Sequence, residues 1–83
     1  MSLIEQIYEA TQSGDLTQPF TMQQVKTWIV SNSITKDDGS EYAETSINAI
    51  LSNSDVANNP TTNKNIKVLS SRVNEQGIKE YWF

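Results

Sequence analysis

The chain has 83 residues, a formal net charge of −4, and neither cysteine nor histidine. This length predicts a single domain over residues 1–83. The composition excludes disulfides and thiolate metal sites, and it lacks the commonest general base and the commonest zinc ligand. We therefore expect a non-enzymatic protein with no metal and no cofactor.

The N-terminal sequence has no basic stretch followed by an apolar run, and the apolar runs elsewhere are too short to cross a bilayer. These features predict a cytoplasmic, bacterial-type protein without a membrane partner. The charge is unevenly distributed, because residues 1–55 hold eight acidic and two basic side chains, whereas residues 56–83 hold four basic and two acidic ones. The only basic excess thus lies in the C-terminal part.

A first helix is predicted over residues 3–13. Ser2 and Glu5 have the spacing of a capping box, in which each side chain bonds the backbone N–H of the other residue. Gly14 is suited to end the helix because glycine readily adopts the left-handed conformation. One face is apolar and consists of Leu3, Ile4, Ile7 and Tyr8.

A second helix is predicted over residues 22–31. Thr21 and Gln24 form another capping box, which marks its start. Phe20 and Val25 occupy the positions of a hydrophobic staple across this start. The stripe expected to be buried consists of Val25, Trp28 and Ile29.

A third helix is predicted over residues 41–54, after a polar turn that contains Gly39. Ser40 is the expected N-cap, and Glu41 and Glu44 would lie in the first turn, where negative charge favours the helix dipole. Its apolar face is expected to be Ala43, Ile47, Ile50 and Leu51.

The C-terminal part predicts a surface loop over residues 55–65 and a β-hairpin over residues 66–83. The sequence NEQG separates the two strands, and Gly77 is available there for a positive φ angle. Side chains alternate along a strand, so Trp82 and either Tyr81 or Phe83 should lie on opposite faces. The aromatic end of the chain is expected either to fill the core or to form an interface.

Helices followed by a hairpin, with FTMQQVKTWI and YAETSINAIL in the second and third helices, resemble the winged-helix family of helix-turn-helix domains. The likeness is to small bacterial domains of regulatory or restriction-modification type. It implies an α+β fold in which the third helix enters the major groove of double-stranded DNA and the hairpin forms the wing.

The resemblance predicts a DNA-linked regulatory role, with residues of the third helix meeting bases and cations of the wing meeting phosphates. An amide such as that of Asn48 is able to pair with adenine. A homodimer is expected, because one domain with so few cations would bind DNA weakly. The candidate residues are Thr45, Ser46, Asn48, Ala49 and Ser52 on the helix, and Lys67, Arg72 and Lys79 in the wing.

A second hypothesis is a protein-binding module on the same fold, with an acidic surface that meets a basic protein partner. The acidic residues concerned are Asp37, Asp38, Glu41 and Glu44. The arrangement of charge distinguishes the two hypotheses. Cations gathered beside Asn48 would favour DNA, whereas a surface dominated by carboxylates would favour a protein.

Overall fold

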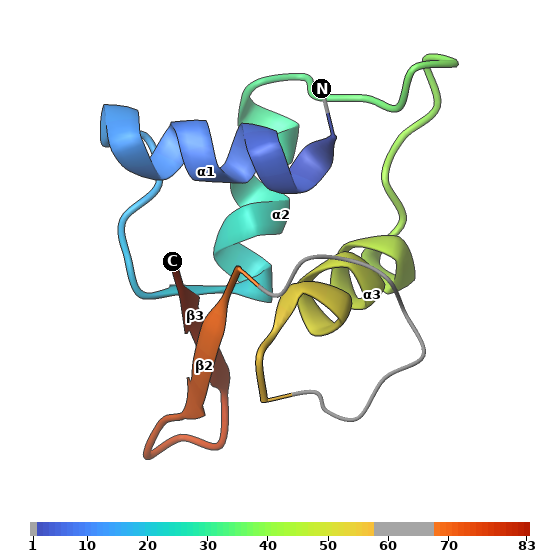
Figure 1. The fold of residues 1–83 in the computed structure, drawn as a ribbon. Coiled ribbons are helices and arrows are strands. Elements are labelled where there is room, and N and C mark those ends of the chain that lie inside the picture. Colours follow the sequence, from blue (N-terminus) through green and yellow to red (C-terminus); the bar gives the residue numbers. More distant parts are fainter. Residues whose placement is uncertain (1, 58–67) are drawn as a thin grey trace.

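The computed structural model describes residues 2–57 and 68–83 (Figure 1). These residues form a small α+β domain with three helices and a three-stranded antiparallel sheet. The candidate wing residue Lys67 lies outside the described residues. In chain order the elements are α1 (Leu3–Ser13), β1 (Phe20–Thr21), α2 (Met22–Ser31), α3 (Glu44–Ser54), β2 (Ser70–Val73) and β3 (Lys79–Trp82).

Helices α1 and α2 have the predicted bounds, and both begin with the predicted capping boxes. In α1, the Ser2 hydroxyl accepts from the Glu5 backbone N–H at 3.3 Å, and the Glu5 carboxylate accepts from the Ser2 N–H. In α2, Thr21 and Gln24 make the same reciprocal pair at 3.2 and 2.9 Å. Gly14 ends α1 in the left-handed conformation, with φ of 88°. These local signals are therefore confirmed.

Strand β1 was not expected from the sequence. It pairs with β3, placing Phe20 opposite Tyr81 and Thr21 opposite Glu80, while β2 lies on the other side of β3. Phe20 is fully buried and its ring stacks on that of Tyr81 with centroids 6.2 Å apart. Two residues are too few for strand alternation to be recognised, so only the pairing with β3 reveals this strand.

The predicted start of the third helix is wrong by three residues. Helix α3 begins at Glu44, and its N-cap, Ala43, makes no side-chain cap bond. Ser40 is held in the preceding turn, where its backbone N–H and its hydroxyl both donate to Asp38 at 2.9 and 2.6 Å. Glu41 therefore lies outside the first turn. It belongs to an arm, residues 35–43, that extends away from the helices (Figure 1).

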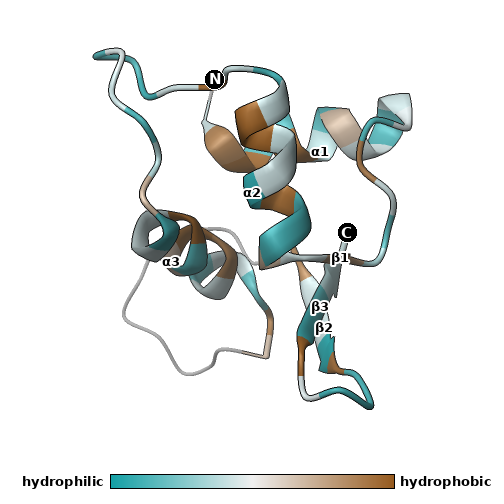
Figure 2. Ribbon diagram, turned by 180° about the vertical axis from the view of Figure 1, so that it is seen from behind, coloured by the Kyte–Doolittle hydropathy of each residue, from teal (hydrophilic) through white to brown (hydrophobic). Residues whose placement is uncertain are grey.

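The apolar face of α3 is largely as predicted. Ile47 and Leu51 are fully buried and Ile50 is half-buried, but Ala43 is exposed because it precedes the helix. Hydrophobic residues of the helices lie mainly on the sides that face other elements (Figure 2).

Residues 58–65 of the predicted surface loop lie outside the described residues. The first residue of that prediction, Asp55, is not at the surface, because it is buried and pairs with Leu69 in a parallel bridge. The hairpin turn itself is confirmed. The Gly77 N–H donates to the Asn74 carbonyl at 3.0 Å, and Gly77 has φ of 79°. Strand β2 starts only at Ser70.

Aromatic residues divide between the core and its edge. Tyr81 is buried, and Phe83 packs against the core from the same side. Trp82 is half-buried and approaches Arg72 instead, as strand alternation predicts. Trp28 was expected in the buried stripe but is only half-buried against the core.

The Thr21 cap provides a test of how strongly local signals fix α2. Thr21→Ala removes the hydroxyl that satisfies the Gln24 N–H and should lower the free energy of unfolding by about 1 kcal/mol. Thr27→Ala is the matched control, because Thr27 is exposed within the same helix and alanine favours helix. Urea unfolding followed by circular dichroism measures both. Equal losses in the two variants would contradict a capping role.

Candidate nucleic-acid interface

The outer face of α3 presents small, uncharged side chains. Thr45, Asn48 and Ala49 are exposed. The 100° step per residue places Thr45 and Ala49 opposite the buried Ile47, and it places Asn48 at the edge of this outer face that is nearer Leu51. Four of the predicted recognition residues thus share one side, since Ser52 lies between Asn48 and Ala49 around the helix.

Ser46 lies elsewhere. It is half-buried and follows the same i, i+4 row as Ile50, near the edge of the buried face. The predicted recognition surface therefore leaves out Ser46, and Asn48 provides the one side-chain amide among the four residues that share this side.

The hairpin is joined to the end of α3 by backbone hydrogen bonds. The Leu69 N–H donates to the Ser54 carbonyl, and the Val56 N–H donates to the Leu69 carbonyl, both at 2.8 Å. Leu69 itself is fully buried. These contacts fix the position of the first hairpin strand relative to α3.

The Asp55 side chain strengthens this junction. It is fully buried, and its Oδ2 atom accepts from Lys79 Nζ at 2.8 Å and from Ser71 Oγ at 2.6 Å. Its Oδ1 atom accepts from the Ala57 N–H at 2.9 Å. Ser71 belongs to β2 and Lys79 to β3, so one carboxylate connects the C-cap of α3 to both strands of the hairpin.

The ionisation of this cluster follows from its contacts. Burial alone would raise the pKa of the Asp55 carboxyl, but the hydrogen bonds from Lys79 and Ser71 hold this pKa below its usual value. The hydrogen bond to Asp55 raises the pKa of Lys79 against the opposing effect of burial. Both groups are therefore charged around neutral pH.

Arg72 follows Ser71 in β2, and its side chain also has interaction partners. Its Nε atom is 3.0 Å from Glu80 Oε1, its cross-strand neighbour, and its guanidinium lies 5.8 Å from the Trp82 ring centroid. The Arg72 side chain is still 62% exposed and that of Glu80 is 20% exposed, so solvent screens this ion pair from the Arg72 side.

Each positively charged side chain among the described residues lies against a carboxylate or an aromatic ring. Lys26 pairs with Glu44 at 3.0 Å, and Lys36 lies over the Tyr42 ring. The carboxylates of the 35–43 arm, in contrast, are exposed. Hydrogen bonds from Ser40 lower the pKa of one of them, Asp38, which keeps it charged.

The sequence identified Lys79 as a phosphate-binding candidate but missed its partners. Asp55 stands in a polar stretch that resembles a loop, and Ser71 is an ordinary hydroxyl on a short strand. No local pattern signals that these groups meet Lys79, because they come from three separate elements.

None of the helices within residues 2–57 and 68–83 is long and apolar enough to cross a membrane. The same residues contain no group of three or more Asp or Glu side chains placed to hold a metal ion. In comparisons with known proteins, no family model, no curated protein and no solved structure matches the chain.

Removing the cation from the buried cluster should destabilise the fold. Lys79→Met leaves the Asp55 carboxylate buried with fewer donors and should lower the free energy of unfolding by about 1–3 kcal/mol at neutral pH. Arg72→Met is the matched control, since it breaks a solvated pair on the same hairpin and should cost below about 0.5 kcal/mol.

The pH dependence separates an electrostatic loss from a packing loss. In the native chain the lowered pKa of Asp55 adds stability above its unfolded pKa, and this stability is lost as pH falls through the folded pKa. Lys79→Met should reverse that contribution, because an inadequately paired buried carboxyl has a raised pKa. Urea unfolding at neutral and acidic pH should thus show a deficit that shrinks on acidification. A constant deficit would point to lost packing alone.

Proposed function

We propose that the chain is a winged-helix domain that binds double-stranded DNA, with α3 as the recognition helix and the β2–β3 hairpin as the wing. The observation that carries the proposal is the junction at Asp55, where one buried carboxylate connects the end of α3 to both strands of the hairpin. Three helices followed by the β2–β3 hairpin is the order that the resemblance to winged-helix domains implies, and it supports the proposal. A reader of DNA needs helix and wing in a fixed relation, because both must meet one duplex.

The proposed division of labour follows from exposure. Asn48 and Thr45 offer hydrogen-bonding groups to base edges, and Arg72 offers an exposed guanidinium to phosphate. The Lys79 ammonium pairs with Asp55, so Lys79 stabilises the junction and is less available to bind phosphate. With few cations available, one copy binds duplex DNA weakly, and a two-fold dimer would double the number of phosphate contacts.

The protein-binding alternative rests on a separate observation. Each cation of the described residues already has a partner, whereas Asp37, Asp38 and Glu41 are exposed on the 35–43 arm. A basic protein partner would find this arm complementary in charge. In this case the outer face of α3 would stay free of nucleic acid.

An NMR titration of the labelled protein with a mixed-sequence duplex, first at low and then at raised salt, decides between these functions. DNA binding should shift amides of α3 and the hairpin, and the shifts should weaken as salt rises. An unchanged spectrum up to millimolar duplex would overturn the DNA proposal and favour the protein-binding alternative.

A charge variant in the hairpin makes the test sharper. Glu80→Gln removes the carboxylate that competes with phosphate for Arg72, and should tighten duplex binding by about two- to fivefold. Asp15→Asn is the control, since it changes the net charge equally at an exposed position before β1. Equal gains in both variants would indicate a general charge effect instead of a wing contact.

A further inference from the structure

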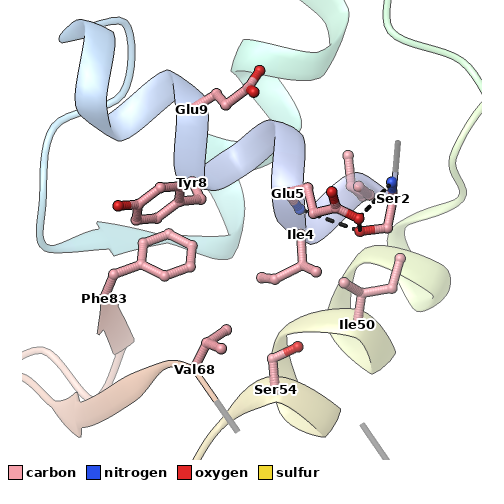
Figure 3. A pocket seen from close by; sticks show the side chains of 10 residues that line it. Ser2, Ile4, Glu5, Tyr8, Glu9, Ile50, Ser54, Val68 and Phe83 are labelled. Atoms are coloured by element: carbon pink, nitrogen blue, oxygen red, sulfur yellow. Dashed lines mark hydrogen bonds between the residues drawn. The ribbon is translucent and has the colours of Figure 1, made fainter. Parts of the chain in front are cut away.

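A groove of about 870 Å³ runs between α1, the C-terminal half of α3 and the end of the hairpin (Figure 3). Neither the proposed DNA contact nor the acidic arm uses it. Two large apolar side chains that line it are exposed, Tyr8 at 47% and Val68 at 41%, so the groove presents apolar surface to solvent. The apolar lining consists of Leu3, Ile4, Tyr8, Ile50, Val68 and Phe83.

One wall of the groove is held in place without any ligand. The Phe83 ring meets the edge of the Tyr8 ring with centroids 5.1 Å apart (Figure 3). The Phe83 backbone N–H donates to Gln18 Oε1 at 2.7 Å, and its ring also approaches Phe20. A partner would therefore meet a preformed apolar surface and lose little affinity to ordering it.

Acidic side chains of α1 lie beside the apolar lining of the groove at helical spacing. Along α1, Ile4 and Tyr8 form one i, i+4 row, and Glu5 and Glu9 form the adjacent row. Both carboxylates border the groove, and no ion pair within the described residues involves either of them. Hydrogen bonds from Ser2 lower the pKa of Glu5, so this edge stays negative.

We propose that this groove binds an amphipathic helix of another protein, with apolar side chains seated among Tyr8, Phe83 and Ile50 and with Lys or Arg side chains beside Glu5 and Glu9. The i, i+4 repeat of α1 is about 6 Å, and a second helix offers apolar and basic rows at that same repeat. The basic row supplies the charge that α1 lacks, since residues 3–13 contain no Lys or Arg.

The charge pattern argues against a second copy of the chain as the occupant. Two copies of α1 facing each other would bring Glu5 and Glu9 toward the same carboxylates, with no cation on either helix to compensate. Nucleic acid would meet the same repulsion. A basic amphipathic helix is the occupant that satisfies both rows.

The groove is also independent of the proposed DNA surface. Ile50 and Ser54 border it from one i, i+4 row of α3, whereas Asn48 lies on the far side of that helix. An occupant of the groove thus leaves the outer face of α3 accessible, and the two proposals can fail separately.

The test uses a synthetic peptide of about 15 residues with Leu in an i, i+4 row and Lys in the flanking rows. Titration into the isotope-labelled full chain should shift Ile4, Tyr8, Ile50 and Phe83. Fluorescence anisotropy should show at least about tenfold weaker binding for the same peptide with Glu in place of Lys. Equal binding of the two peptides, or no binding up to millimolar peptide, would overturn the proposal.

Variants identify the surface. Tyr8→Ser should weaken peptide binding by about tenfold, and Glu9→Gln by about two- to fivefold. Val30→Ser and Asp15→Asn are the matched controls, because both residues are exposed outside the groove, and they should leave affinity unchanged. Peptide-induced shifts confined to the outer face of α3, or nuclear Overhauser contacts between residues 58–67 and the Tyr8 ring in the free protein, would contradict the assignment.

Discussion

The C-terminal half of this fold depends on one buried carboxylate, that of Asp55. Burying Asp55 is unfavourable unless donors surround it, and these donors come from β2, from β3 and from the backbone just beyond α3. The hairpin must therefore stay beside α3 for the charge to be satisfied. Apolar contacts alone would permit sliding, whereas a hydrogen-bonded charge fixes distance and orientation.

The buried Asp55 carboxylate is paired with Lys79, a cation that would otherwise face solvent. Lys79 serves the buried cluster, Arg72 meets Glu80, and Lys26 meets Glu44, so the described cations mainly balance the chain's own carboxylates. Any polyanionic partner must compete with these pairs, most easily at the solvated Arg72. The polar outer face of α3 and the apolar, acidic groove beside α1 lie on different sides of α3.

Helix boundaries were predictable where the signal and its effect lie within one turn. The capping boxes that begin α1 and α2 join residues three positions apart, and Gly77 shapes a turn within NEQG. The start of α3 was not predictable in this way, because the Ser40 side chain is suited both to cap a helix and to complete the preceding turn. Its bonds to Asp38 complete the preceding turn and leave the helix to begin at Glu44.

The sequence by itself determined the ends of α1 and α2 and the turn of the hairpin, because each depends on neighbours within a few residues. Only the tertiary structure decided that Phe20 and Thr21 form an edge strand, since their partners lie about sixty residues away. It also decided that Lys79 serves Asp55, and that α1 and the end of the hairpin form a groove. Such contacts depend on which elements pack together. The hydrophobic periodicity and the capping residues of one segment do not specify which distant segment it will contact.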